Sequence, residues 1–238
     1  MATATKAATP WGGAIEDQAC VVTLTNITVT GNVSIGGDGG ALAEGGEGQG
    51  GGLFSEVGAT MTVTNSTISN NTAISGRGGA GGDGGHAAGG GIYNNSASLT
   101  VTACIVSDNT VTGGHGGAGG VGGRAEGGGI FSANEDGVPT FLTVSNTTLE
   151  GNVVTGGTGD VGGHGWGGGL YLDDTTACIK NSIIRHNLAD GGDGVTDGEG
   201  AGGGVYIASG HVVIKNTIVA DNEASTSDDD LFGSYFSD

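Results

Sequence analysis

Proline and aromatic residues are scarce in this chain, which has 2 prolines and 5% aromatic residues. The lack of proline excludes a collagen-like triple helix in spite of the 56 glycines, because collagen needs proline in its Gly-X-Y repeat. So few large side chains in 238 residues also argue against an ordinary compact core. We therefore expect order to come from repeated backbone hydrogen bonding around a thin apolar column.

Positive charge is scarce as well: 6 Lys and Arg stand against 25 Asp and Glu, a formal net charge of -19. Such a chain repels phosphate backbones, so we expect no nucleic-acid partner. No apolar run approaches the roughly 18 residues that cross a bilayer, so no membrane span is expected. The first ten residues have no apolar segment typical of a signal peptide, so we expect either a mature or excised module or export that uses information outside this chain.

Three cysteines, Cys20, Cys104 and Cys178, are an odd number without metal-type spacing. We interpret them as free thiols. An intermolecular bridge through Cys20 stays open as an alternative.

A repeat runs through the whole chain. Each unit has a glycine cluster, two apolar residues, a short turn, Thr/Val alternation and a closing Asn. The glycine clusters with their apolar residues lie at 12–15, 50–54, 89–93, 127–131, 167–171 and 202–206. The closing residues, 35 to 43 residues apart, are Asn32, Asn71, Asn109, Asn152, Asn187 and Asn222. A recurring period of this size indicates a solenoid.

Alternation within each unit predicts strands with one buried face. One inward column comprises Leu24, Val63, Val101, Val144, Ile179 and Ile214, and a second comprises Val29, Ile68, Val106, Leu149, Ile184 and Val219. We expect three short strands per coil: one after the glycines, one through Thr-Val-Thr and one before the closing Asn. The predicted fold is all-β, a single right-handed parallel β-helix of about six coils with stacked glycine-rich inserts on one side. It spans 1–238 as one domain: an end region with the first glycine cluster (1–15), the repeats (16–227) and an acidic C-terminal end (228–238).

Asparagines are expected to form structural ladders. Besides the closing set, a second set lies between the second and third strands: Asn26, Asn65, Asn146, Asn181 and Asn216. Asn tolerates the left-handed conformation there and can hydrogen-bond its counterpart one coil away. Ala103 interrupts this set. Glycosylation sequons such as Asn26-Ile-Thr28 coincide with it, and we interpret them as structural, packed in a turn.

The glycine-rich inserts change length by one whole Gly-Gly-X triplet, from 18 to 15 residues between closing Asn and next glycine triplet. Three residues per turn is the period of a polyproline-II-like helix, whose outward backbone groups can pair between stacked inserts. Triplet phase then aligns two columns of side chains. The first is Asp38, Arg77, His115, Thr158 and Asp193, and the second is Glu47, His86, Arg124, His164 and Glu199.

The Gly-Gly-Gly-Ile-Tyr and Leu-Thr-Val-Thr-Asn pattern with a closing Asn resembles the right-handed β-helix repeats of bacterial surface and secreted proteins, such as polymorphic outer-membrane or autotransporter-like adhesins. The resemblance covers nearly the whole chain and implies architecture rather than activity. The Gly-Gly-X inserts depart from those repeats and are similar to polyglycine-II adhesin tips and glycine-rich antifreeze proteins.

Enzyme activity on polysaccharides is the least favoured function. A glycosidase needs two carboxylates at a defined separation, and a lyase needs clustered acids with Ca²⁺ and a base. The nearest approach is Asp173, Asp174, Asp190 and Asp193 with Lys180 and Arg185, all explained by turns and exposed strands. We expect no enzyme, no catalytic residue and no cofactor. Weak Ca²⁺ binding stays open, with Asp38, Asp193 and Asp197 as candidates.

Outward Thr pairs predict a flat face for binding ice or a glycan: Thr23, Thr25, Thr62, Thr64, Thr100, Thr102, Thr143 and Ser145. Thr is also a good exposed strand residue in its own right. Cys178, Lys180 and Lys215 interrupt the face in the last coils.

The two ends of the predicted solenoid bear on its function. Neither 1–15 nor 228–238 offers a capping helix, so we expect exposed strand edges. These edges predict end-to-end association into a homopolymeric filament, unless flanking repeats of a longer protein cover them. The preferred function is a non-enzymatic structural or adhesive module, extracellular or at the cell surface. The alternative is an ice-, glycan- or receptor-binding protein that uses the Thr face or the glycine-rich flange.

Overall fold

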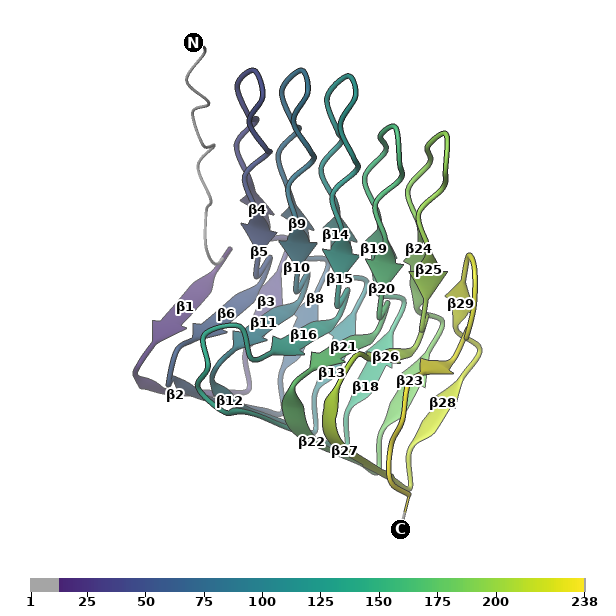
Figure 1. Ribbon diagram of the computed structural model, residues 1–238. Coiled ribbons are helices and arrows are strands. Elements are labelled where there is room, and N and C mark those ends of the chain that lie inside the picture. The colour runs from purple at the N-terminus through teal and green to yellow at the C-terminus, as the bar shows by residue number, and fades with distance from the viewer. Residues whose placement is uncertain (1–12, 238) are drawn as a thin grey trace.

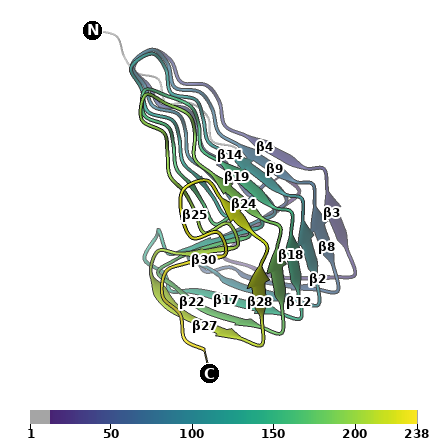
Figure 2. The ribbon, with the colours of Figure 1, turned by 90° about the vertical axis from the view of Figure 1, so that its right-hand side faces the viewer.

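The computed structural model describes residues 13–237, which form one parallel β-solenoid of about six turns (Figure 1). Viewed with the last coil nearest the reader, the chain runs counter-clockwise as it approaches, so the solenoid is right-handed (Figure 2). No helix among these residues is long and apolar enough to cross a membrane. The all-β prediction is confirmed.

Each complete coil contributes to five sheets, so the expectation of three strands per coil is wrong. Sheet 1 holds β1 (Ile15–Gln18), β6 (Leu53–Glu56), β11 (Ile92–Asn95), β16 (Ile130–Ala133), β21 (Leu170–Asp173), β26 (Val205–Ile207) and β30 (Leu231–Phe232). Sheet 2 holds β2 (Val21–Thr25), β7 (Thr60–Thr64), β12 (Ser98–Thr102), β17 (Thr140–Ser145), β22 (Thr175–Lys180) and β27 (Gly210–Lys215). Sheet 3 holds β3 (Thr28–Thr30), β8 (Thr67–Ser69), β13 (Ile105–Ser107), β18 (Thr148–Glu150), β23 (Ile183–Arg185) and β28 (Ile218–Ala220).

The two sheets that sequence reasoning missed lie at the root of the inserts. Sheet 4 holds β4 (Val33–Ile35), β9 (Thr72–Ile74), β14 (Thr110–Thr112), β19 (Val153–Thr155), β24 (Leu188–Asp190) and β29 (Glu223–Ala224). Sheet 5 holds β5 (Gly48–Gln49), β10 (Ala87–Ala88), β15 (Ala125–Glu126), β20 (Gly165–Trp166) and β25 (Gly200–Ala201). The strands of sheet 5 have two residues each, mostly Gly and Ala, so no apolar alternation in the sequence predicts them.

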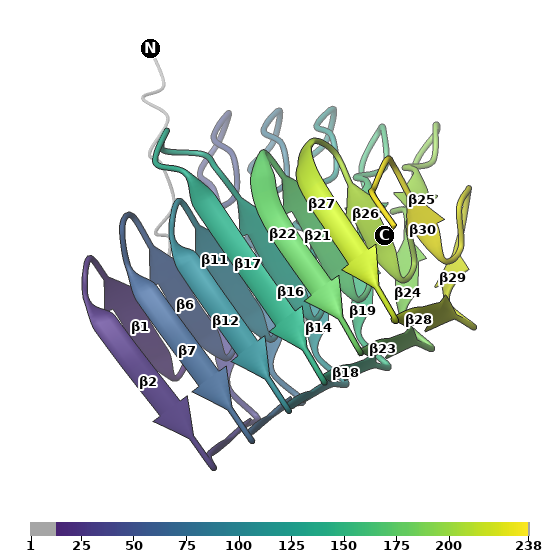
Figure 3. The same ribbon diagram turned by 90° about the horizontal axis from the view of Figure 1, so that it is seen from below.

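The inward columns stack as expected. Val63, Val101 and Val144 are consecutive partners across sheet 2, and all three are fully buried. Ile68, Val106 and Leu149 do the same in sheet 3. Together with Ile92 and its equivalents from sheet 1 they form one apolar cluster along the axis. Seen from below, the strands of sheet 2 lie side by side as a flat layer (Figure 3).

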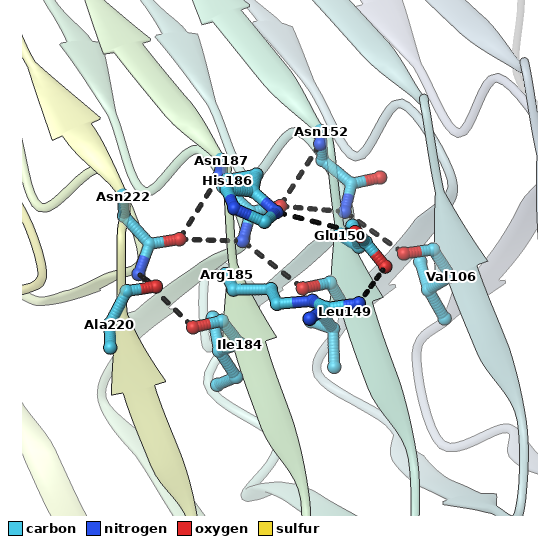
Figure 4. Close-up of polar contacts among 10 residues, drawn as sticks. All are labelled: Val106, Leu149, Glu150, Asn152, Ile184, Arg185, His186, Asn187, Ala220 and Asn222. Atoms are coloured by element: carbon cyan, nitrogen blue, oxygen red, sulfur yellow. Dashed lines mark hydrogen bonds and ion pairs between the residues drawn. The ribbon is translucent and has the colours of Figure 1, made fainter.

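The closing asparagines form a continuous buried ladder. In each step the backbone N–H and the Nδ2 of one Asn donate to the Oδ1 of the next, as from Asn109 to Asn152 at 3.1 and 2.9 Å. The same Nδ2 also donates to a strand carbonyl of the preceding coil, that of Ile68 for Asn109. Figure 4 shows the arrangement for Asn152, Asn187 and Asn222. This predicted ladder is confirmed.

The second asparagine set does not form a ladder of side chains. Asn26, Asn65, Asn146, Asn181 and Asn216 have φ between +46° and +56°, as does Ala103 with +53°. In this left-handed turn their side chains are exposed, and among the described residues no hydrogen bond joins them. The ladder at this corner uses the following residue instead, for example Thr147 N–H to Ser182 Oγ and Ser182 N–H to Thr217 Oγ1, both 3.3 Å. The expected hydrogen-bonded set and the packed sequons are therefore wrong.

The inserts stand as a stacked flange above the body (Figure 1). Each has an outbound and a return arm, and backbone N–H groups pair both between coils and between arms. Gly39 N donates to Arg77 O of the next coil at 2.7 Å, while Gly46 N donates across its own insert to Gly37 O at 2.7 Å. A Cβ placed on Gly79 would lie 1.8 Å from Gly40 O, so side chains are excluded at these contacts. The predicted stacking is confirmed.

The C-terminal residues close much of the last coil, contrary to expectation. β30 pairs with β26 in sheet 1, Ser227 bridges to Ala201 in sheet 5, and Phe236 bridges to Val213 in sheet 2. Asp230 Oδ1 also accepts from Asn222 Nδ2 at 2.9 Å, which ends the asparagine ladder. No helix is needed because the tail simply continues the parallel pairing. The expectation for residues 1–12 lies outside the described residues.

Replacing Gly123 tests the flange packing. A Cβ at Gly123 would lie 1.8 Å from Gly85 O, so Gly123→Ala should lower the free energy of unfolding by about 3 kcal/mol. Gly119→Ala is the matched control, because Gly119 has φ +82° but open space around it, and it should cost only about 1 kcal/mol. Denaturant titration measures both. Equal costs would mean that close contact between neighbouring inserts does not hold the flange.

Replacing Asn109 tests the closing ladder. Asn109→Ala removes the hydrogen-bond partner of Asn71 Nδ2, of Ile68 O and of Asn152 Oδ1. We therefore expect the free energy of unfolding to fall by about 3 kcal/mol. Asn65→Ala removes an exposed Asn and should cost less than about 1 kcal/mol, as the natural Ala103 at the equivalent position indicates. Thermal unfolding of the two variants compares them, and a larger loss for Asn65→Ala would contradict this assignment.

Candidate functional site

Aromatic side chains fill a concave corner where sheet 5 meets the outer face of sheet 1. They form one ladder along the axis, with neighbouring ring centroids 4.5 to 5.5 Å apart. Its members are Phe54, Tyr93, Phe131, Tyr171, Tyr206 and Phe232. The ladder lies outside the central core and makes a separate apolar cluster with small residues such as Ala88. It supplies a solid floor on the outside of the solenoid.

A groove of about 850 Å³ lies beside the return arms of the first four inserts. One wall is the flange, and Glu135 contributes from a loop between β16 and β17. The charged and imidazole groups that line it are Glu44, Glu47, Asp83, His86, Arg124, Glu135 and His164. We call this space the flange groove.

The second insert column is aligned as predicted, and it runs along this groove. Gly48 N donates to His86 O, Ala87 N to Arg124 O and Ala125 N to His164 O, which aligns Glu47, His86, Arg124 and His164 on successive coils. Three groups able to carry positive charge are therefore adjacent, at the strand spacing of about 4.8 Å. In a chain with 6 Lys and Arg this is an unusual concentration.

The acid that holds this column in place was missed from the sequence. Glu126 of β15 is 3% exposed, with Oε2 3.0 Å from His86 Nε2 and Oε1 3.7 Å from Arg124 Nη1. Its Oε1 has no hydrogen-bond partner among the described residues. The sequence signal is a lone acid directly before a glycine triplet, where the equivalent residues are Gln49, Ala88, Trp166 and Ala201.

The protonation of this pair follows from its surroundings. Burial disfavours the charged forms of both groups, but their mutual attraction and hydrogen bond outweigh it. The pKa of His86 is raised above 6.5 and the pKa of Glu126 is lowered below 4.5. Glu126 therefore favours the charged imidazolium of His86 in the groove wall.

Residues 134–139 form a strap that sequence reasoning also missed. Glu135 N donates to Asn95 Oδ1 at 2.9 Å, and Tyr93 Oη donates to Glu135 Oε2 at 2.9 Å. Gln49 Nε2 donates to the Tyr93 hydroxyl at 3.2 Å, which extends the network to the first coil. Burial raises the pKa of the Glu135 carboxyl, although the Tyr93 hydrogen bond opposes this. The extra length of the fourth coil thus builds the wall opposite the flange.

Trp166 closes the floor beside Arg124. Its ring is stacked on His164 at 4.8 Å and on Tyr206 at 5.2 Å, with the Arg124 guanidinium carbon 5.9 Å from its centroid. Both ring faces are thus occupied by protein groups. His164 Nδ1 accepts from Glu199 N–H at 3.0 Å, so the neutral ring carries its proton on Nε2.

The first insert column lies on the outbound arms, outside the groove. Asp38 Oδ1 accepts from Arg77 N at 2.8 Å and His115 Nδ1 lies 2.7 Å from Thr158 Oγ1, so the predicted alignment holds. Asp38 and Asp193 stand at opposite ends of this column, and Asp197 Oδ1 accepts from Gly194 N. The three calcium candidates do not meet. Within residues 13–237 no three His, Cys, Asp or Glu side chains gather as a metal site.

The Thr face is in register on sheet 2. Thr23, Thr62, Thr100 and Thr143 are consecutive partners, and so are Thr25, Thr64, Thr102 and Ser145. Thr23 and Thr25 are exposed, the other Thr side chains are half-buried and Ser145 is buried. Cys178 with Val213, and Lys180 with Lys215, continue the two columns as expected.

The remaining residues weighed for catalysis are spread over the coil. Asp173 ends β21 in sheet 1, whereas Lys180 ends β22 in sheet 2, beyond six extended residues or roughly 20 Å. Arg185 is bound to Glu150 at 3.2 Å in sheet 3, as Figure 4 shows.

The three cysteines are free: Cys104 is buried, Cys20 is exposed and Cys178 is half-buried.

Titration of His86 tests the Glu126 contact. Because the folded pKa of His86 is raised, its ion pair stabilises the fold fully below pH 6.5, and this contribution is lost as pH rises through the raised pKa. Glu126→Gln should lower the pKa of His86, observed by NMR of the ring protons. Glu199→Gln, which removes an acid at the column's end, is the control and should leave the His86 titration unchanged. An identical His86 pKa in wild type and Glu126→Gln would contradict the assignment.

Comparisons with protein-family models, with curated proteins and with solved structures found no match for this chain. What the flange groove binds must therefore follow from its own groups.

Proposed function

We propose that this protein is a non-enzymatic extracellular module of the structural or adhesive kind, which holds a ligand in the flange groove. The observation that carries the proposal is the groove itself. Its polar walls come from four successive inserts and a dedicated strap, with a buried carboxylate supporting two of its side chains. Buried charges are costly unless paired, so a solenoid built only as a spacer has no need for one here.

The rigidity of the surroundings supports recognition. The arms are paired in two directions, and Tyr93 and Trp166 contact the groove residues Glu135 and His164, so these side chains are held before any ligand arrives. A preorganised site loses less conformational entropy on binding. The large negative charge favours solubility in the extracellular setting that we propose.

A binding role fits the groups better than catalysis. An acid–base mechanism would need two carboxyl groups with different pKa values, and Glu126 and Glu135 near the groove shift in opposite directions. Glu126 lies beneath His86 and Arg124 and does not line the groove. A substrate would have to displace those groups to reach its carboxylate.

The repeats also resemble those of bacterial surface adhesins, and the inserts are similar to polyglycine-II adhesin tips; we retain both resemblances as part of the proposal. End-to-end assembly would use the edges that the C-terminal tail leaves unpaired, β28 and β29 in sheets 3 and 4. Such a contact would place copies head to tail along the axis.

A second candidate is an ice- or glycan-binding role for the Thr face. The supporting observation is the unbroken register of outward hydroxyl residues over four coils of a flat sheet. Regularly spaced hydroxyls on a flat surface suit a regularly repeating ligand.

The two surfaces are separated by paired variants. Labelled protein is applied to a glycan array and to freezing solution, with Arg124→Ala/His164→Ala in the groove and Thr62→Tyr/Thr100→Tyr on the Thr face. We expect glycan capture to disappear in the groove variant and to persist in the Thr variant. We expect no thermal hysteresis from the wild-type protein. Hysteresis lost in the Thr variant, or capture insensitive to the groove variant, would overturn the groove proposal. Electron microscopy of the same samples shows whether rods lengthen with concentration.

A further inference from the structure

The flange groove contains three side chains that can carry a positive charge, and some of their N–H groups have no acceptor among the described residues. His86 commits Nε2 to Glu126, and among the described residues its Nδ1 has no hydrogen-bond partner. His164 uses Nδ1 to accept from Glu199 N–H, which leaves its Nε2–H as a donor. The Arg124 side chain is 54% exposed and its nearest acid is 3.7 Å away, beyond hydrogen-bond length. Arg124 and His164 thus present unsatisfied donors to one space, and His86 adds a third donor, Nδ1–H, when its ring is protonated.

The buried acid shows that this column is a built feature. Glu126 has a side chain only 4% exposed, and its Oε1 accepts no hydrogen bond from the described residues. It supplies one negative charge beneath His86 and Arg124, so these three groups together carry one net positive charge when His86 is protonated. That local positive charge favours an anion beside Arg124, although acids line the rest of the groove and the chain as a whole carries -19.

The rest of the groove presents acceptors. Glu44, Glu47, Asp83 and Glu135 line it, and the Glu135 carboxylate already accepts from Tyr93 Oη. Carboxylates repel further anions but accept hydrogen bonds from hydroxyl groups. A polyanion without hydroxyls is therefore disfavoured, and a neutral sugar would leave the guanidinium unpaired. The groups suit a ligand with one anionic group surrounded by hydroxyls.

Stacking contributes little here, because the faces of Trp166 are covered by His164 and Tyr206. Ion pairing and hydrogen bonding must therefore carry most of the recognition, with Arg124 able to hold a carboxylate through two parallel N–H groups.

From this arrangement we infer that the flange groove binds an acidic saccharide of the uronic-acid class. Its carboxylate lies against His86, Arg124 and His164, and its hydroxyls donate to Glu47 and Glu135. Glu126 acts as a positioning residue that holds His86 and Arg124 without touching the ligand. This inference rests on the proposed function, since it assigns the chemistry of the ligand to the same groove.

Isothermal titration calorimetry with galacturonic acid, its methyl ester and neutral galactose tests the inference. We expect the acid to bind at least about 10-fold more tightly than the other two, and Arg124→Ala to remove that difference. Arg124→Lys keeps the positive charge but lacks the two parallel N–H donors of the guanidinium, so it should retain part of the affinity difference. Arg77→Ala, the same residue type on the outbound arm, is the matched control and should bind as wild type.

Glu126→Gln separates positioning from folding. Circular dichroism and thermal melting show whether the variant folds. With the fold retained, affinity for the acid should fall together with the pKa of His86, while the weak affinity for neutral galactose stays unchanged. Equal affinity for acid and ester, or equal losses in Arg124→Ala and Arg77→Ala, would overturn the inference. If no uronate binds but the groove variant still abolishes array capture, only the ligand class is wrong. If the groove variant abolishes nothing, the proposed function itself fails.

Discussion

Coil-over-coil registration is the constraint on which everything else in this structure depends. Every coil donates and accepts backbone hydrogen bonds along five parallel sheets, and the closing Asn secures the phase by bonding to the coils on both sides. Because side chains alternate between faces, a slip of one residue would turn the Val and Ile columns out of the interior. The buried amide ladder makes that slip costly, since each of its members would lose several partners at once.

The same registration turns a glycine-rich segment into a rigid wall. Arms of neighbouring inserts approach so closely that a Cβ at Gly123 or Gly79 would overlap a carbonyl oxygen. Glycine is needed there for space rather than for a left-handed conformation. Only the residues between the glycines of each triplet carry side chains, so the flange presents them as aligned columns at the coil spacing. The groove inherits its chemistry from one such column.

The buried ion pair of Glu126 serves the groove more than the stability of the fold. A buried ion pair is weak support for stability, since replacing it with apolar groups is often neutral or favourable. Here the pair joins β15 to His86 one coil earlier, and it orients Arg124 of its own coil. The strap at 134–139 adds a second wall and interrupts the regular coil length to do so. Both features concentrate on one side of the solenoid, whereas the Thr face opposite carries only regular strand residues.

The sequence by itself determined the period, the two inward columns, the closing ladder and the phase of both insert columns. It could do so because a solenoid coil contacts only its neighbours, so that equivalent positions in the repeat become neighbours in space. Tertiary structure alone decided the rest. The two-residue strands of sheet 5 have no pattern of their own, and their pairing creates the corner where the aromatic ladder and Glu126 meet. The turn at Asn65 sends its side chain outward, the tail pairs with three sheets, and Glu135 reaches Tyr93 across 42 residues. These contacts depend on the cross-section of the coil, which a linear repeat does not encode.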